Sequence, residues 1–383
     1  VEIAEQTRTF GGRALRAALD SSPLWGAGKV EDTYNLLGHA LRKALSVIAR
    51  QQGRGLAEVA AEAGAPVIGG TSLKAALDRD WDDPAERAVA LRTVLDALDA
   101  VEGWVAGQPL APTETMKPVI EASLAAAHQV VAQDVETAGN GAPVVRRGVA
   151  KDRRISVEDA QMRHGRKSRS HLFDGFKRHV LRELEQGVIR AVALTPANQP
   201  EASATDDIAA DLARQEVTLV ELHLDRAYLN SSLVRDRPPD LLIYCKAWPV
   251  RNRWGFPKTA FTLDWQTQTI TCPHEVIIPF QAGHTVRFPE EECTPCPLRA
   301  RCTTSCHGRS VAIHPDERLL AELRERQTTT EGRAKLRERV GVEHALAHIG
   351  HWQGDRARYR GVRKNLFDLR RAAIVHNLHI IAR

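Results

Sequence analysis

The chain has 383 residues, of which 43% are hydrophobic and 26% charged, a composition typical of a folded globular protein. No run of 18 apolar residues occurs, and the N-terminal residues lack the basic and apolar regions of a secretory signal, so we expect a cytoplasmic protein without membrane spans. The net charge is only +5, so a nucleic-acid partner has to be argued from where the charges lie.

The first predicted unit, residues 1–29, contains a core strand and a loop. Residues 13–19 are mostly apolar and are compatible with either a strand or the end of a helix. Residues 20–28 contain a proline and two glycines, which predicts a loop after Asp20. The second unit, residues 30–137, is rich in Ala and Leu at helical spacing and predicts an inserted helical bundle.

Residues 138–245 are predicted to form the α/β core. After a basic loop, apolar runs at 172–176, 188–194 and 217–224 predict strands, and a short helix is expected at 204–215. A strand, strand, helix, strand order is typical of an α/β fold.

The last two units differ sharply in composition. Residues 246–314 are rich in Trp, Thr, Pro and Cys and lack helical periodicity, which predicts a β-rich, Cys-containing insertion. Residues 315–383 return to helical spacing and are expected to be C-terminal helices of the core. The expected fold class is therefore α/β, with a helical insertion and a β-rich insertion.

Positive charge is concentrated in two segments. Residues 146–183 contain 12 Lys or Arg against 5 Asp or Glu, and residues 333–383 contain 12 against 4. Such segments predict a surface that faces DNA phosphates, although solvated helix faces are an equally simple explanation. The candidate DNA-binding residues in these segments are Arg166, Lys167, Lys177, Arg339 and Arg360.

Three acidic residues are candidates for catalysis. Asp225 directly follows an apolar strand, Asp20 follows another apolar run, and Glu343 lies on a predicted helix. Taken singly, the two Asp residues could cap a helix or a turn, and Glu343 could be a surface residue. Together they could hold Mg²⁺, which prefers oxygen ligands, and two such ions can drive phosphodiester chemistry.

Several short motifs, in this order over residues 10–383, resemble the DDE transposases of bacterial insertion sequences. The matching stretches are 19–28, 30–34, 173–177, 194–198, 224–228, 339–344 and 359–361. The resemblance implies an RNase H-like catalytic core in which Asp20, Asp225 and Glu343 hold Mg²⁺ or Mn²⁺. It also implies double-stranded DNA as the partner, with a homodimer in the DNA complex.

The chain departs from the family pattern in two respects. Many relatives carry Tyr, Arg, Glu and Lys around the last acid; Arg339 and Glu343 fit, but Leu336 and Gly350 stand where the Tyr and Lys would be. Relatives usually also have a helical region before the first Asp. Only 19 residues precede Asp20, which favours a truncated transposase.

All six cysteines lie between residues 245 and 306, which favours a local metal site in a reducing compartment over a disulfide framework. A C-x₂-C pair followed by two more cysteines has the spacing of a zinc or iron–sulfur site, and zinc suits a structural role in a DNA-processing protein. Incidental buried cysteines are the alternative. The preferred zinc ligands are Cys272, Cys293, Cys296 and Cys302, with Cys306 in reserve; Cys245 is expected in the core.

The leading hypothesis is a transposase that cleaves DNA strands at insertion-sequence ends and transfers them to a target, using two metal ions. The alternative is a catalytically decayed or truncated transposase that acts only as a zinc-containing DNA-binding protein. A third hypothesis is a related nuclease that cuts without joining.

Overall fold

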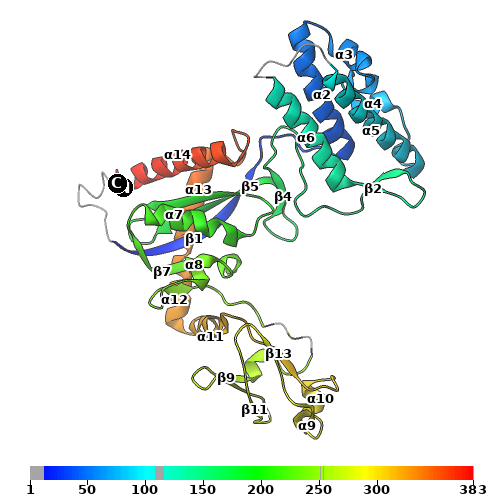
Figure 1. The fold of residues 1–383 in the computed structure, drawn as a ribbon. Helices are drawn as coiled ribbons and strands as arrows, with labels where there is room; N and C mark the ends of the chain where they lie inside the picture. The colour runs from blue at the N-terminus through cyan, green and yellow to red at the C-terminus, as the bar shows by residue number, and fades with distance from the viewer. Residues whose placement is uncertain (1–12, 108–115, 251, 253, 383) are drawn as a thin grey trace.

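The fold is described from a computed structural model, which covers residues 13–107, 116–250, 252 and 254–382. The first part of the predicted unit 1–29 lies outside the described residues. A bundle of helices occupies one end of the molecule, a mixed sheet with its helices the middle, and a small β-rich module the opposite end (Figure 1). The predicted α/β fold class is confirmed. No helix in the described part of the chain is long and apolar enough to cross a membrane.

The central sheet has β5 and β1 at its middle. β1 pairs antiparallel with β5 and parallel with β7, and β7 in turn pairs parallel with β8. On the other edge, β4 and β6 pair antiparallel with successive parts of β5. The strands of this sheet are β1 (Ala14–Trp25), β4 (Arg163–Arg166), β5 (Leu172–Glu183), β6 (Ile189–Pro196), β7 (Thr218–Leu224) and β8 (Leu242–Tyr244).

Side chains of β1 alternate between two hydrophobic layers, as expected for a strand buried on both faces. Ala17 and Leu19 pack on the face covered by α7 and α11. Ala18 packs on the opposite face, against residues of α13 and α14. The even-numbered positions of β1 therefore point toward α13, and this parity decides where Asp20 points.

The sheet is covered by helices on both faces. α14 and α7 both contact β6, and α13 crosses β1 and β5. The helices and 3₁₀ turns of this central part are η2 (Glu201–Ala204), α7 (Thr205–Ala213), η3 (Arg226–Tyr228), α8 (Ser232–Arg235), α11 (Glu317–Arg326), α12 (Thr330–Glu338), α13 (Val340–Gln353) and α14 (Val362–Ile381).

The prediction of a loop directly after Asp20 is wrong, because β1 continues through Asp20 to Trp25. This part of β1 pairs with β5 along its whole length, whereas its pairing with β7 stops at Leu19. From Asp20 to Leu24 one side of the strand therefore has no partner strand among the described residues; only Trp25 regains a partner there, in a parallel bridge to Arg356. A proline is tolerated at such an edge position, which explains why Pro23 does not end the strand.

The helical bundle (residues 33–134) follows β1 in the chain and has its own hydrophobic core. Its first helix begins at the cap Asp32, whose side chain accepts a hydrogen bond from the Asn35 amide at 3.0 Å. Leu37, Leu41 and Leu45 of this helix are fully buried. The elements are α2 (Thr33–Gln52), α3 (Leu56–Glu62), η1 (Pro66–Ile68), α4 (Leu73–Leu77), α5 (Pro84–Ala106) and α6 (Lys117–Asp134), followed by the hairpin of β2 (Val135–Thr137) and β3 (Pro143–Val145).

The cysteine module (residues 258–312) consists of short strands around a small aromatic core. That core contains Phe261, Phe280 and Phe288. Its elements are η4 (Lys258–Ala260), β9 (Thr262–Asp264), β10 (Thr269–Thr271), β11 (Ile277–Pro279), β12 (Thr285–Arg287), α9 (Glu290–Cys293), α10 (Arg299–Cys302) and β13 (Ser310–Ala312).

A buried histidine of β5 makes the stability of the core depend on pH. His179 is fully buried and hydrogen-bonds to the Tyr228 hydroxyl at 2.8 Å and the Thr195 hydroxyl at 3.0 Å. Burial, together with the charge of Lys177, lowers the pKa of His179 to about 3. In the unfolded chain its pKa is about 6.5, so the unfolded state takes up a proton that the folded state refuses.

We therefore expect the free energy of unfolding to fall as the pH drops below about 6.5, with His179 contributing roughly 1.4 kcal/mol per pH unit. Urea unfolding of the wild type and His179→Gln at pH 7.0, 6.0 and 5.0 measures this contribution. The variant should be less stable at pH 7.0 but lose stability less steeply on acidification. Equal slopes for the two proteins would show that His179 is not the group responsible.

Candidate active site

Asp20 and Asp225 lie on neighbouring parallel strands and point the same way. Leu19 of β1 pairs with Leu224 of β7, and each Asp is the next residue along its strand. Both leucines pack in the layer on the α7 side of the sheet. Because side chains alternate along a strand, the two carboxylates that follow point to the other face, toward α13. The predicted strand 217–224 and the strand of Asp20 are thus neighbours in one sheet.

Asp20 is largely buried, and its carboxylate has two defined partners. Its Oδ1 accepts the Ser21 amide at 2.8 Å, and its Oδ2 accepts the guanidinium of Arg339. Burial raises the pKa of Asp20, and the charges of Asp225 and Glu343 act in the same direction, whereas Arg339 opposes the rise. The three acids are therefore close enough to influence one another electrostatically.

Arg339 also connects Asp20 to the third acid. Its second guanidinium nitrogen donates to Glu343 Oε1 at 2.8 Å. Arg339 is the residue at which α13 begins and Glu343 lies four residues later, so the two side chains meet on one face of the helix. Glu343 is half exposed, at 51% of its side chain, which leaves its carboxylate accessible to a ligand.

Asp225 plays two parts at the end of β7. Its side chain accepts the Arg226 amide at 2.8 Å and caps the turn η3, which is the structural role that the sequence left open. The residue is nevertheless exposed and lines the same cleft as Asp20, Arg339 and Glu343. Capping uses one carboxylate oxygen and leaves the other for a ligand.

The donor set of this cleft suits a hard divalent cation. Three carboxylates from β1, the end of β7 and α13 line one opening, together with the cations Lys167, Arg178 and Arg339. Oxygen ligands from separate elements, with room for water, are what Mg²⁺ or Mn²⁺ require. Asp20, Asp225 and Glu343 thus share one cleft, but within the described residues they are not a group whose ligand atoms all lie within 4.8 Å of one another, so their role as metal ligands stays a prediction.

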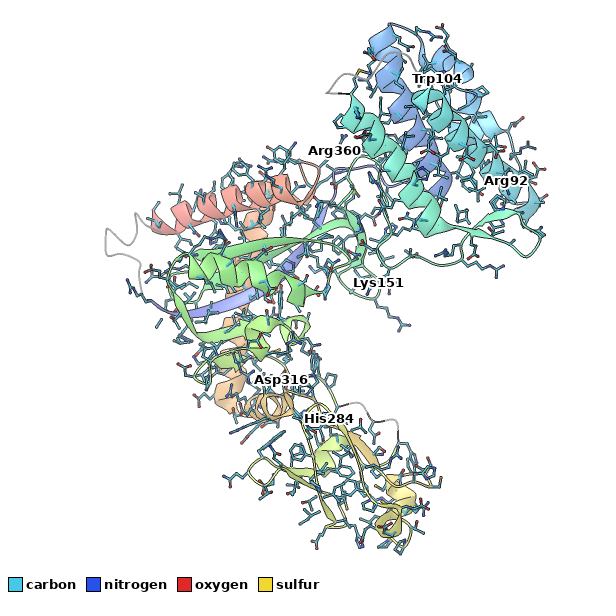
Figure 2. All side chains as sticks on the ribbon, viewed as in Figure 1. Arg92, Trp104, Lys151, His284, Asp316 and Arg360 are labelled. Carbon is cyan, nitrogen blue, oxygen red and sulfur yellow. The ribbon has the colours of Figure 1, made fainter. Side chains whose placement is uncertain are left out.

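The five candidate DNA-binding residues occupy different environments. Lys167, in the turn between β4 and β5, lines the acidic cleft, and Arg166, at the end of β4, lines an adjoining pocket that shares Asp20 and Asp225 with the cleft. Lys177 lines that adjoining pocket and is buried in an ion pair with Glu201 at 2.9 Å. Arg339 faces the acids rather than the solvent, and Arg360 pairs with Glu158. Figure 2 places Arg360 between the sheet and the helical bundle.

Neither insertion contributes to the described lining of the cleft. The described residues that line it come from β1, the β4–β5 turn, β5, the turn after β7, and α13 with its flanking residues. In Figure 1 the helical bundle and the cysteine module extend from opposite ends of the central part. The cleft itself therefore gives no support for a contact between either insertion and a bound substrate.

Sequence reasoning missed Arg178, which also lines the cleft. This side chain is almost fully buried, and it donates to the Ser22 hydroxyl at 2.8 Å and to the Gly354 carbonyl at 2.9 Å. It thereby ties β1 to the end of α13, on the face that carries the acids. β5 also carries Asp174, Lys177, Arg182 and Glu183, so no pattern in the sequence singled out Arg178.

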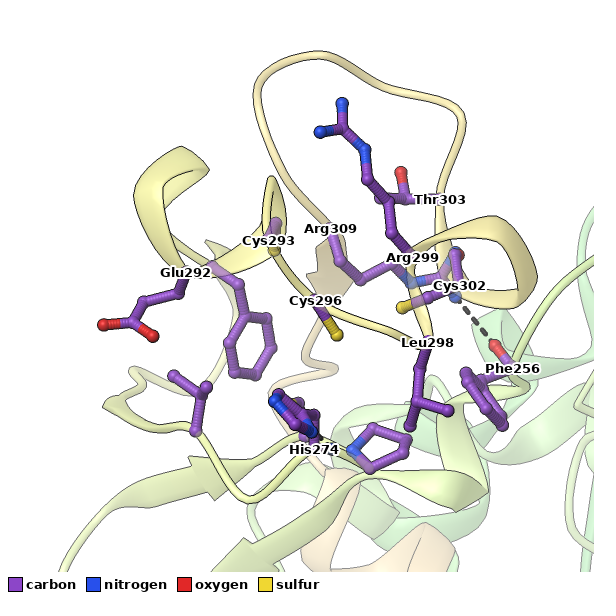
Figure 3. Close-up of a pocket in the computed structure, with 14 residues that line it drawn as sticks. Phe256, His274, Glu292, Cys293, Cys296, Leu298, Arg299, Cys302, Thr303 and Arg309 are labelled. Atoms are coloured by element: carbon purple, nitrogen blue, oxygen red, sulfur yellow. Dashed lines mark hydrogen bonds between the residues drawn. The ribbon is translucent and has the colours of Figure 1, made fainter.

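Four cysteines of the cysteine module line a single cavity (Figure 3). They are the four preferred ligands, Cys272, Cys293, Cys296 and Cys302. Burial raises the pKa of the Cys302 thiol, and the other three cysteines raise it further. The His274 amide donates to Cys272 Sγ at 3.3 Å, a contact that stabilises a thiolate.

The remaining cysteines lie elsewhere. Cys306 is exposed, and Cys245 is buried in the core beside the sheet, as expected. Within the described residues, the group of potential ligand atoms that lie within 4.8 Å of one another is Glu221, His223 and Glu338. The four thiols thus share a cavity without being drawn together as tightly as in a metal-bound tetrahedron.

Comparison with known families covers the C-terminal part of the chain. Residues 272–382 match the family model of the transposase DDE domain, and this segment contains Glu343 and most of the cysteine module. No curated protein and no solved structure matches the chain. This C-terminal segment is therefore similar to the DDE domain of transposases.

Proposed function

We propose that the protein cleaves DNA at the ends of an insertion sequence and transfers the freed ends to a target, using an RNase H-like catalytic core. The observation that carries this proposal is the meeting of Asp20, Asp225 and Glu343 in one cleft around Arg339. The family match supports the transposase class, since DNA is the partner of that class.

The sheet supports an RNase H-like core. The first acid lies on the first strand, and the second follows β7, which is the fourth long strand of the sheet in chain order. The third acid lies on a late helix, α13, packed across β1. This is the distribution of acids that the family resemblance predicts.

In this proposal the carboxylates hold two Mg²⁺ or Mn²⁺ ions at the scissile phosphate. When bound, the ions supply Lewis-acid activation of the attacking water or DNA 3′-hydroxyl and stabilise the leaving oxygen. Asp20 and Asp225 hold fixed positions because β1 and β7 are paired up to the residue before each acid. Arg166 and Lys167, beside the cleft, bind phosphates on either side of the cleaved bond.

We expect Asp20→Asn and Asp225→Asn to lower Mg²⁺-dependent strand cleavage by roughly 100-fold or more, since each removes a preorganised charge at the reacting phosphate. Binding of double-stranded DNA should change by less than about threefold, because phosphate contacts come from other residues. Cleavage of a labelled end fragment and a filter-binding assay measure the two quantities.

Asp96→Asn serves as the control, because Asp96 is an exposed acid of α5 in the helical bundle. Its cleavage rate should equal that of the wild type. Full cleavage by Asp20→Asn or by Asp225→Asn would remove that residue from the metal site.

The cysteine module is proposed to bind one structural zinc ion through Cys272, Cys293, Cys296 and Cys302. The shared cavity and the hydrogen bond to Cys272 Sγ support this ligand set. The core of the module is small, and a structural ion commonly stabilises such a unit. The proposed ion takes no part in the chemistry at the acidic cleft.

Elemental analysis of protein purified without chelators should find about one zinc per chain. Cys293→Ser and Cys296→Ser should each lose most of it, because a four-ligand structural site tolerates no missing thiolate. Cys306→Ser is the matched control and should retain the metal, since Cys306 is exposed and outside the cavity lining. Wild-type protein that contains no zinc under reducing conditions would show that the four cysteines are not a structural metal site.

The second candidate is a decayed transposase that binds DNA without cutting it. Leu336 and Gly350, at positions where many relatives carry Tyr and Lys, favour this alternative. It predicts salt-dependent DNA binding by the wild type and no cleavage at any Mg²⁺ or Mn²⁺ concentration.

For the leading proposal, the active transposase, we propose that the protein works in the cytoplasm and forms a homodimer in the DNA complex.

A further inference from the structure

A second group of charged residues lies on the same face of the sheet as the acids. Arg16 precedes Asp20 by four positions on β1, and it pairs in register with Glu221, which precedes Asp225 by four positions on β7. Even-numbered residues of β1 point toward α13, so the side chain of Arg16 lies on the same face as that of Asp20. The side chains of Arg16 and Glu221 meet at 2.7 Å.

Two residues of α12 complete this group, which we call the charge cluster: Arg16, Glu221, His223, Lys335 and Glu338. Arg16 donates to Glu338 at 2.5 Å, and Lys335 donates to both oxygens of Glu221 at 3.1 and 3.2 Å. His223 bonds to Glu221 at 2.7 Å. The cluster thus joins β1 and β7 to α12.

The spacing of Glu221, His223 and Glu338 would suit a metal ion, since their ligand atoms lie within 4.8 Å of one another. The surrounding charges do not. Arg16 and Lys335 already contact both carboxylates, so a divalent cation would enter a site that is close to neutral and crowded with cations. The cluster is therefore an ion-pair network rather than a metal site.

The protonation states agree with a network of ion pairs. Burial favours a higher pKa for Glu221, but the hydrogen bonds from Arg16, His223 and Lys335 outweigh it and lower the pKa to about 2. The pKa of Arg16 is raised, chiefly by its hydrogen bond to Glu221. Both groups are thus charged at every pH at which the protein would work.

α12 has little apolar contact to hold it in place. Gly332 is its one buried residue among those described, and Lys335 lies over the Tyr244 ring at 5.7 Å. Its position on the sheet therefore depends on the charge cluster. The helix ends at Glu338, and the next residue is Arg339, which contacts Asp20 and Glu343.

We propose that the ion pair of Arg16 with Glu338 positions the joint between α12 and α13, and so places Arg339 and Glu343 over Asp20. Arg16 and Glu338 are positioning residues and touch no substrate. The inference rests on the proposed function only in that the acids are taken to bind the catalytic metal.

Glu338→Gln tests this proposal, because it removes the charge of the α12 partner and keeps its shape. The matched control is Glu185→Gln, since Glu185 contacts the same Arg16 at 2.7 Å but does not belong to α12. Mn²⁺ binding, followed by electron paramagnetic resonance, and the Mg²⁺ dependence of cleavage are measured for both variants.

We expect Glu338→Gln to weaken Mn²⁺ binding about tenfold and to raise the half-saturating Mg²⁺ concentration similarly, as is usual when a residue that orients a metal ligand is lost. DNA affinity should stay unchanged, and the melting temperature should fall by less than about 4 °C because the pair is partly exposed. Glu185→Gln should bind Mn²⁺ as the wild type does. Equal metal binding by the two variants would overturn the proposal, and so would a Glu338→Gln protein that unfolds.

The Mn²⁺ measurement separates this inference from the proposed function. Wild-type protein that binds Mn²⁺ but does not cleave DNA refutes the catalytic proposal and still tests the positioning role. A variant with Asp20→Asn, Asp225→Asn and Glu343→Gln should bind no Mn²⁺. Residual binding that disappears on adding Glu221→Gln would identify the charge cluster as a metal site and overturn its assignment as ion pairs.

Discussion

The parallel pairing of β1 with β7 is the constraint on which the candidate site depends. Because Leu19 and Leu224 are partners in register, the residues that follow them must lie side by side and point to the same face. A shift of one residue in either strand would turn one carboxylate toward the α7 side of the sheet. The buried layer of Leu19, Leu222 and Leu224 opposes that shift, since it would expose apolar side chains.

Electrostatics on this face follow from the same register. Two pairs of charged residues lie on this face, each with one member on β1 and one on β7. Arg16 and Glu221 form the first level along the strands, and Asp20 and Asp225 form the second level, four residues further along. The first level is neutralised within the protein by pairing of opposite charges. At the second level burial raises the pKa of Asp20, the like charges of Asp225 and Glu343 add to the rise, and Arg339 opposes it. One sheet face thus holds both a closed ion network and an open acidic site.

The sequence was sufficient where local pattern decides the structure. Asp225 was expected after a buried strand because an apolar run ends there, and four cysteines were expected together because of their spacing. It was insufficient where tertiary contacts decide. Pro23 suggested a loop, yet the strand continues because β5 pairs with it. Lys177 was expected at phosphates, but it pairs with Glu201 in the folded chain.

The distribution of charge also limits which parts of the molecule can bind DNA. Residues 33–134 of the helical bundle contain 9 Lys or Arg against 13 Asp or Glu, in a chain that totals 53 against 48. The bundle is therefore acidic, and the surplus of positive charge lies in the central part and its C-terminal helices. A polyanion is attracted to the basic surface and repelled by the acidic one. The β4–β5 turn beside the cleft, with Arg166 and Lys167, is accordingly better suited to hold DNA than the acidic bundle.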